Sequence, residues 1–265
     1  MFYLITGASQ GIGYEISKLL YKNKNKLILC SRKINSLKNK FKKNTLLISS
    51  DLTKIKDIKK IKNKLIKEKI KIKAIISCHA ELGEPLCIFE KKNKKKWLNI
   101  FETNFISNVN LIYELMPFII KNDYSKIIFF SGGGVFTTWP KFSSYSVSKT
   151  ALVKYMENLS SELKEFKIIV NAIAPGFLNT NIHKRNMKKL ENLNERYRIE
   201  LRMNKNKKPN FKNVKGLIQF LVNNKNINLS GKTISANFDK WKDKKNFLMK
   251  LSKYENSLQI IRKNI

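Results

Sequence analysis

The sequence has few of the residues that stabilise small secreted proteins or bind metals. Its 265 residues include three cysteines, two histidines and five prolines. Three cysteines are an odd number, and their positions do not follow metal-ligand spacing, so we expect neither a disulfide framework nor a metal site. We predict that the cysteines are buried thiols in a reducing compartment.

Long apolar segments are also absent. No stretch approaches the ~20 apolar residues of a membrane span. The first apolar run begins at Phe2 and is interrupted at Gly7, which leaves no room for a signal peptide. We therefore predict a cytoplasmic protein with no membrane partner. The length suits one α/β domain, and we expect residues 1–265 to form a single domain.

Acidic residues are scarce. The chain has 19 aspartates and glutamates against 54 lysines and arginines, which gives a formal net charge of +35. Such a charge is compatible with a polyanion partner. However, only six of the basic residues are arginine, whose bidentate fork suits phosphate recognition. We interpret lysine runs such as 91–96 as solvated faces, expect no specific nucleic-acid partner, and keep a nucleic-acid or anionic-surface binder as the least favoured function.

The glycines that are present favour nucleotide binding near the N-terminus. The apolar run 2–5 leads into Thr6-Gly-Ala-Ser-Gln-Gly-Ile-Gly13, after which apolar residues recur at helical spacing. A strand, a glycine turn and a helix start allow backbone amides to approach a dinucleotide pyrophosphate. The candidate cofactor-binding residues in this turn are Gly7, Ser9, Gln10, Gly11, Ile12 and Gly13.

The predicted second strand, 26–31, bears on the choice of cofactor. In dinucleotide-binding folds an acid after this strand contacts the ribose 2′-hydroxyl, whereas a basic residue accommodates a 2′-phosphate. Here Ser31 and Arg32 stand at that point. NADP(H) is therefore the preferred cofactor, with NAD(H) as the second choice; the alternative is that Arg32 is one more surface cation. The third strand, 45–49, is followed by Asp51, Leu52 and Thr53, which we expect to form a turn and helix cap.

Strands and helices alternate along the rest of the chain. The expected helices are 54–71, 97–121, 143–165 and 214–222, and the expected strands are 73–78, a fifth ending at Phe130, 167–173 and 231–236. This alternation predicts an α/β fold with a parallel sheet of about seven strands, helices on both faces, and any ligand at the carboxyl ends of the strands. We interpret residues 181–208 as a mobile helical insertion on the substrate side and residues 241–265 as a C-terminal tail.

A tyrosine and a lysine follow the fifth strand. The apolar run reaches Ser131, three glycines interrupt it, and Tyr145 and Lys149 then stand four residues apart. On a helix this spacing makes the two side chains neighbours. A nearby ammonium lowers the pKa of a phenol from ~10, so the tyrosine could serve as acid and base. Taken alone, this spacing is more typical of a helix-surface pair.

Together these motifs resemble the short-chain dehydrogenase/reductase family over residues 2–237. The resemblance implies a Rossmann-like, doubly wound fold, NAD(P)-dependent hydride transfer with a small-molecule carbonyl or alcohol substrate, and a homodimer or homotetramer packed through two long helices. It implies that Tyr145 is the general acid/base and that Lys149 holds the nicotinamide ribose and lowers the tyrosine's pKa. Asn104 would hold a water, and Ser131 would contact the substrate oxygen. It further implies cofactor contacts at Asp51, Leu52, Pro175, Gly176, Leu178 and Thr180.

Two departures from the family pattern matter. After the fourth strand the chain reads Ser77-Cys-His-Ala80 rather than Asn-Asn-Ala-Gly, and we assign His79 no chemistry. Ser131 stands fourteen residues before Tyr145 rather than thirteen, where Gly132 sits. We expect the glycines 132–134 to bulge and bring Ser131 to the substrate oxygen; the alternative is that Gly132 occupies that position. The displaced serine keeps open a second function, a cofactor-binding protein with little turnover.

Overall fold

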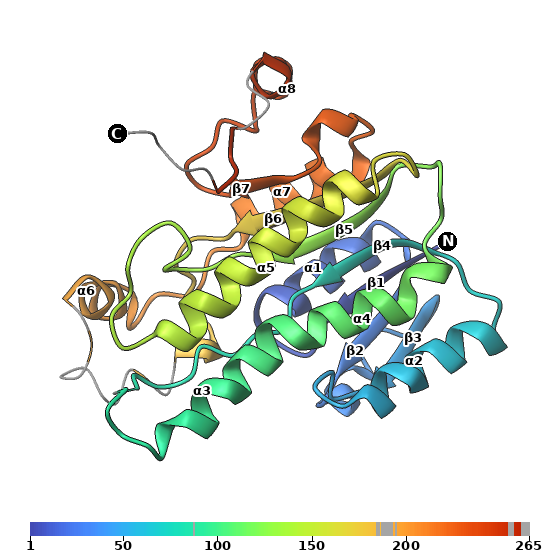
Figure 1. Ribbon diagram of the computed structural model, residues 1–265. Coiled ribbons are helices and arrows are strands. Elements are labelled where there is room, and N and C mark those ends of the chain that lie inside the picture. Colours follow the sequence, from blue (N-terminus) through green and yellow to red (C-terminus); the bar gives the residue numbers. More distant parts are fainter. Residues whose placement is uncertain (87, 184–185, 187–192, 194, 254–256, 261–265) are drawn as a thin grey trace.

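The computed structural model describes residues 1–265 except 87, 184–185, 187–192, 194, 254–256 and 261–265 (Figure 1). Its centre is one seven-stranded sheet in the order β3-β2-β1-β4-β5-β6-β7, in which every neighbouring pair is parallel. The predicted parallel sheet of about seven strands is thus confirmed. The strands are β1 Phe2–Thr6, β2 Lys26–Ser31, β3 Thr45–Ser49, β4 Ile72–Ser77, β5 Ser125–Phe130, β6 Ile168–Ala174 and β7 Lys232–Ser235.

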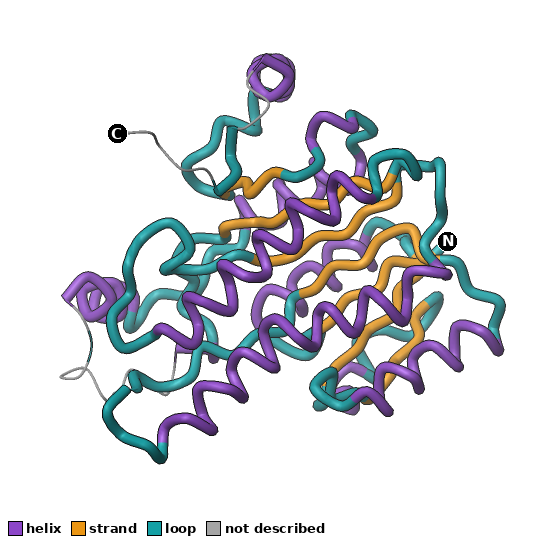
Figure 2. The backbone as a smooth tube through the Cα atoms, viewed as in Figure 1, coloured by secondary structure: helices purple, strands orange, loops and turns teal. Residues whose placement is uncertain are grey.

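Helices cover both faces of the sheet (Figures 1 and 2). One face packs against α1 (Gly11–Lys22), α7 (Lys212–Asn223) and α8 (Lys244–Lys253), and the other against α2 (Ile55–Lys67), α4 (Ser107–Leu115) and α5 (Ser143–Glu162). Strand β5 shows why both faces need a cover: Ile127 and Phe129 join one core, and Ile128 and Phe130 join the other. Because successive strand residues point to opposite faces, a continuous apolar run requires burial on both sides.

The helix expected over 97–121 is divided in the structure. It consists of α3 (Asn93–Phe101), a π-helical segment (Glu102–Ile106) and α4, followed by a short 3-10 turn at Met116–Phe118. The expected end at residue 121 was wrong because Pro117 cannot donate a backbone hydrogen bond to continue an α-helix. The π-helical segment inserts an extra residue into the helical turn, and such insertions often mark functional sites.

Only part of the 181–208 insertion is described. It contains a 3-10 turn at Asn181–His183 and helix α6 (Glu195–Asn204), which lies beyond the carboxyl ends of the strands (Figure 1). The predicted tail contains α8 and then returns to the sheet, where Leu258 O accepts a hydrogen bond from Thr233 N at 2.9 Å. Lysines 91, 92 and 94–96 are exposed, as predicted for a solvated face. No described helix is long and apolar enough to cross a membrane.

Candidate active site

A cavity of about 940 Å³ opens at the carboxyl ends of β1, β4, β5 and β6. It lies where the chain order of the strands reverses between β1 and β4, which is the expected place for a ligand in a doubly wound sheet. Two of the predicted site residues, Gly13 and Asn104, are not part of its wall. The predicted residues that line it are Gly7, Ser9, Gln10, Gly11, Ile12, Arg32, Asp51, Leu52, Ser131, Tyr145, Lys149, Pro175, Gly176, Leu178 and Thr180.

The glycine turn between β1 and α1 is built for close backbone approach. Gly7 has a φ of +61°, and a Cβ there would lie 3.0 Å from the backbone of Cys78 and His79. A Cβ on Gly13 would lie 2.5 Å from the carbonyl oxygen of Gly7, so Gly13 lets α1 pack against the turn from behind the cavity. A Cβ on Gly11 would meet only Thr180, at 3.8 Å. The turn therefore packs closely against the protein backbone at Gly7 and Gly13 and leaves open space toward the cavity at Gly11.

The first turn of α1 can accept an anion. Its N-cap residue, Gln10, makes no side-chain capping bond, and the turn contains no acidic residue. The first backbone N–H groups of a helix lack intrahelical partners and carry partial positive charge. These donors, with the open side of Gly11, fit the pyrophosphate of a dinucleotide.

One end of the cavity lies at the ends of β2 and β3. Ser31 Oγ donates to Ser9 Oγ at 2.7 Å, while Arg32 is exposed at the rim. The expected helix cap does not form, because Asp51 accepts from Thr53 Oγ1 at 2.8 Å and α2 starts after Lys54 without a side-chain cap. Burial acts to raise the pKa of Asp51, but the hydrogen bonds from Thr53 and the charges of Arg32 and Lys54 lower it overall. Asp51 is therefore ionised at neutral pH.

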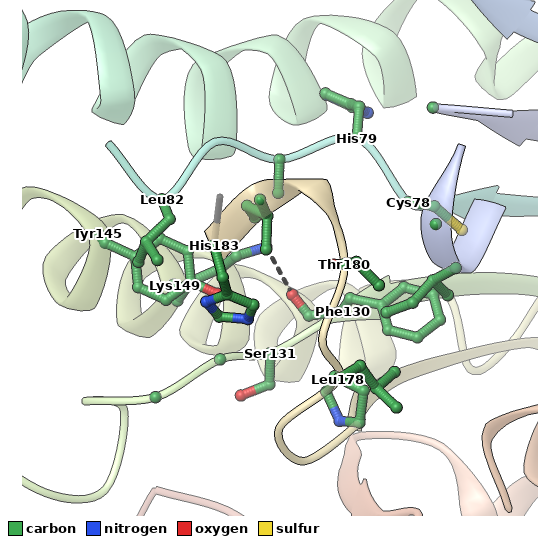
Figure 3. Close-up of a pocket in the computed structure, with 18 of the residues that line it drawn as sticks. Cys78, His79, Leu82, Phe130, Ser131, Tyr145, Lys149, Leu178, Thr180 and His183 are labelled. Carbon is green, nitrogen blue, oxygen red and sulfur yellow. Dashed lines mark hydrogen bonds between the residues drawn. The ribbon is translucent and has the colours of Figure 1, made fainter. Parts of the chain in front are cut away.

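Tyr145 and Lys149 lie on the first turns of α5 and both face the cavity (Figure 3). Lys149 Nζ donates to the Phe130 carbonyl oxygen at 2.8 Å and lies 5.9 Å from the centre of the Tyr145 ring. Burial lowers the pKa of Lys149 to about 8. The expected lowering of the tyrosine pKa is wrong for this structure: burial, together with Tyr197, raises the pKa of Tyr145. The phenol is therefore protonated and can act as an acid.

Ser131 and Gly132 lie next to Tyr145 in an arrangement that differs from the expected bulge. Ser131 N still donates to Ile173 O at 2.9 Å, so the strand ladder continues through it. The Ser131 hydroxyl is buried without a hydrogen-bond partner and points away from Tyr145 (Figure 3). A Cβ on Gly132 would instead lie 2.3 Å from the Tyr145 hydroxyl oxygen. Only Gly134 of the three glycines has a positive φ. The geometry thus favours the alternative in which Gly132 occupies the expected serine position.

Asn104 is fully buried in the π-helical segment, not exposed to solvent. Its Oδ1 accepts from Glu81 N at 2.8 Å, and its Nδ2 donates to Glu81 O at 2.8 Å and to Ser148 Oγ at 3.0 Å. These bonds tie the loop after β4 to α5. They satisfy a buried amide, which explains why an asparagine is tolerated inside a helix.

His79, to which the sequence interpretation assigned no chemistry, is a packed group between β1, β4 and α4. Its Nδ1 lies 2.7 Å from Thr6 Oγ1, and its Nε2 lies 2.8 Å from Ser107 Oγ. Burial, assisted by the charges of Lys149 and Arg32, lowers its pKa to about 3, so the ring is neutral. Thr6 also accepts from Cys78 N at 3.0 Å. The neutral imidazole therefore joins the glycine turn of β1 to the end of β4 and to α4.

The sequence interpretation missed a group of aromatic residues on the Tyr145 side of the cavity. They come from the loops after β5 and β6 and from α6, and they lie around Tyr145: Trp139, Phe177, His183 and Tyr197. Their sequence positions follow neither helical nor strand periodicity. Local pattern analysis therefore could not place them in one site.

The prediction of buried thiols is confirmed for Cys30, whereas Cys78 is only partly buried. Cys30 and Cys78 are free, Cys30 is buried, and burial raises the pKa of both, that of Cys30 to about 12. Cys87 lies outside the described residues. Within the described part of the chain no group of three or more histidine, cysteine and acidic residues could hold a metal ion.

Comparisons with known proteins agree with this architecture. Residues 2–191 match the model of the short chain dehydrogenase family. Dehydrogenase/reductase SDR family member 7B of Xenopus tropicalis is 27% identical over 68% of the chain, and the match spans 61% of that relative. The 3-oxoacyl-[acyl-carrier-protein] reductase FabG of Rickettsia typhi is 30% identical over 68% of the chain and 73% of that protein.

A solved structure shares the fold. It is that of a variant of actinorhodin polyketide ketoreductase with NADPH, with a TM-score of 0.74, 18% identity, and coverage of 88% of the chain and 94% of the ketoreductase. The family match extends through the glycine turn and through Tyr145 and Lys149. The chain belongs to the short-chain dehydrogenase/reductase family of oxidoreductases.

Proposed function

We propose that the protein is an NADP(H)-dependent enzyme that interconverts a small-molecule carbonyl compound and its alcohol. The observation that supports this most directly is a single cavity that contains both an anion-binding helix start and a buried, protonated tyrosine, Tyr145. A cofactor held at the first turn of α1 and a substrate beside Tyr145 would thus share one enclosed space. A perturbed titratable group in such a cleft is a candidate for catalysis.

Residues at the ends of β1 and β2 would set the cofactor preference. Ser31 is engaged with Ser9, and no acidic side chain follows β2 to contact a ribose 2′-hydroxyl. Arg32 and Lys33 stand at the rim of the cavity, where a 2′-phosphate would gain charge-assisted hydrogen bonds. Structural relatives support the same class of cofactor, since the actinorhodin ketoreductase structure contains NADPH.

The chemistry divides between the cofactor and the chain. When bound, the dihydronicotinamide supplies a hydride to the carbonyl carbon and is oxidised. Tyr145 donates its phenolic proton to the carbonyl oxygen as the C=O double bond becomes a single bond. Lys149, whose buried ammonium is held by Phe130 O, stabilises the phenolate left on Tyr145. Asn104 positions this pair through Ser148 on α5.

Ser131 keeps a smaller part in this proposal. Its hydroxyl has no partner in the structure and does not approach Tyr145, so polarisation of the carbonyl rests on the Tyr145 hydroxyl alone. A substrate contact by Ser131 would require a rotation of its side chain and stays a prediction. At Gly132 the Tyr145 hydroxyl and ring already fill the space that a Cβ would take, so the missing side chain lets the phenol lie against the backbone.

The test compares the wild-type protein with Tyr145→Phe. NADPH oxidation would be followed across a panel of aliphatic, sugar and aromatic carbonyl compounds, and NADPH affinity by fluorescence titration. We expect turnover to fall 10²-fold or more, because a general acid contributes that much, while NADPH affinity stays unchanged. Near-native turnover in the variant would remove Tyr145 from the mechanism. NADPH binding with no turnover of any carbonyl would favour the cofactor-binding protein instead.

We also propose a homodimer or homotetramer packed through the long helices. Three large apolar side chains are exposed on α3, α4 and α5: Leu98 is 51% exposed, Tyr113 76% and Val147 46%. Helices α4 and α5 cover the same face of the sheet (Figure 1). Apolar side chains gathered on one face are typical of a protein interface.

A further inference from the structure

The substrate side of the cavity is walled by aromatic rings, which we call the aromatic end: Trp139, Phe177, His183 and Tyr197. Trp139 contacts Tyr145 edge to face, with ring centres 5.7 Å apart, and contacts Tyr197 in the same way at 5.1 Å. Phe177 stacks on His183 at 4.6 Å with an interplanar angle of 25°. Aromatic rings favour such offset and edge-to-face contacts with other rings. The aromatic end is therefore a preformed slot for a flat apolar group beside Tyr145.

The Tyr197 hydroxyl and the His183 ring bring polar atoms into this wall. The Tyr197 hydroxyl lies 2.8 Å from His183 Nδ1 and 3.5 Å from the amide nitrogen of Asn186. An amide nitrogen can only donate, so the Tyr197 oxygen accepts from Asn186. In the Nε2–H tautomer of His183, the Tyr197 hydroxyl donates to Nδ1. Burial raises the pKa of Tyr197 to about 12 and lowers that of His183 to about 4, so both are neutral at pH 7. The contact with Tyr197 is compatible with this tautomer, which places the imidazole proton on Nε2.

His183 Nε2–H is free to contact a ligand. Among the described residues it makes no hydrogen bond, and it is not among the polar atoms sealed from solvent. His183 lines the same cavity as Tyr145 and projects into it (Figure 3). A buried site that offers one donor rejects ligands that leave the donor unpaired. The aromatic end therefore combines apolar ring faces with two side chains that can donate a hydrogen bond, His183 and Trp139.

We propose that the substrate is an aromatic ketone that carries a second acceptor oxygen, and that His183 Nε2–H binds this second oxygen. This inference rests on the proposed function, because the reacting carbonyl lies at Tyr145. The aromatic ring packs against Trp139 and Phe177.

Three ketones of similar size separate the two features of the substrate. 1-Phenylpropane-1,2-dione has the ring and the second oxygen, 1-phenylpropan-1-one has only the ring, and pentane-2,3-dione has only the second oxygen. We expect kcat/KM with NADPH to be highest for the phenyl dione. The monoketone, which lacks the second oxygen, should have a kcat/KM about two- to tenfold lower, as expected for the loss of one hydrogen bond. Pentane-2,3-dione, which lacks the ring, should have a kcat/KM lower by about tenfold or more, because a buried aromatic ring contributes a large apolar area. Equal values for the phenyl dione and either analogue would overturn the inference.

The variant His183→Phe keeps the ring that stacks on Phe177 and removes the donor. It should lower kcat/KM for the phenyl dione more than for 1-phenylpropan-1-one, so the ratio of the two values should fall in this variant. Tyr197→Phe removes the hydroxyl that contacts His183 Nδ1, so the imidazole proton is no longer held on Nε2. This variant should partly reduce the preference for the dione. An unchanged preference in His183→Phe would show that His183 does not bind the second oxygen.

A binding measurement keeps this test independent of turnover. Saturation-transfer NMR on the NADP⁺-loaded protein should detect the phenyl dione through its ring protons, with weaker binding of the other two ketones and of the dione to His183→Phe. If hydride transfer fails but this order of binding is observed, the proposed function is wrong and the inference about the ligand class stands. If the three ketones bind equally, the inference is wrong whatever the turnover.

Discussion

Alanine substitutions at the adjacent residues Ser131 and Gly132 should have opposite effects. Ser131→Ala removes a hydroxyl that is buried without a partner, so no hydrogen bond is lost. A buried polar group without a partner costs about 1–3 kcal/mol. We therefore expect the free energy of unfolding to stay unchanged or to rise by about 1 kcal/mol, and kcat to change less than threefold.

Gly132→Ala introduces a Cβ into occupied space. That atom would lie 2.3 Å from the Tyr145 hydroxyl oxygen and 2.7 Å from Cζ of the same ring, so the ring or the loop must move. Such overpacking costs about 1–3 kcal/mol, which in a chain of this size lowers Tm by several degrees. Because the displaced group is the proton donor, we also expect kcat to fall at least tenfold.

Thermal unfolding, kcat and NADPH affinity measured together distinguish these outcomes. Gly216→Ala is a matched control, since its Cβ would lie 2.9 Å from the Trp241 ring and outside the cavity. It should lower Tm without lowering kcat. The reasoning is refuted if Ser131→Ala loses more than tenfold in kcat at unchanged NADPH affinity, which would make Ser131 catalytic. It is also refuted if Gly132→Ala keeps native Tm and kcat.

Three further predictions concern the cofactor, pH and assembly. Arg32→Ala should weaken NADPH about tenfold and leave NADH unchanged in a fluorescence titration, because a charge-assisted bond to the 2′-phosphate is lost; equal losses for both would contradict this. Burial depresses the pKa of His79 to about 3 and of His183 to about 4. Below pH 6.5 the unfolded chain therefore binds more protons than the folded protein, and the free energy of unfolding decreases as the pH is lowered. Urea unfolding should show a loss of about 2 kcal/mol per histidine between pH 7.5 and 5, and a flat profile would refute it. Light scattering should give a mass of two or four chains, and Tyr113→Lys should lower it; a wild-type monomer would refute the proposed assembly.

The glycine turn between β1 and α1 could be predicted from the sequence because its determinants are local. Gly7, Gly11 and Gly13 lie within seven residues, and their conformations follow from one strand, one turn and one helix start. The strands were recognisable because both faces are buried, which requires the continuous apolar runs seen in β4, β5 and β6. Most boundaries differed from those expected by only one to a few residues.

Other features depend on contacts that local patterns do not encode. The π-helical segment places Asn104 inside the protein, where its side chain accepts a hydrogen bond from the backbone of Glu81, 23 residues away in the chain. His79 was assigned no chemistry because a single histidine after a strand carries no pattern; its partners Thr6 and Ser107 lie 73 and 28 residues away. The tyrosine pKa was expected to fall because the Tyr145–Lys149 spacing shows the neighbouring charge but not the burial that outweighs it.

The two halves of the cavity therefore differ in how they can change. The cofactor half rests on backbone geometry, where a single added Cβ at Gly7 or Gly13 would collide with other backbone atoms. The aromatic end rests on side chains from separate loops and α6, which lie beyond the sheet and outside its core. Substitutions at the aromatic end should consequently alter which carbonyl compound is accepted while the fold and cofactor affinity persist. The proposed role of the aromatic end also explains why the motifs indicate the reaction class more readily than the substrate, since the aromatic end comes from the part of the chain with the weakest local pattern.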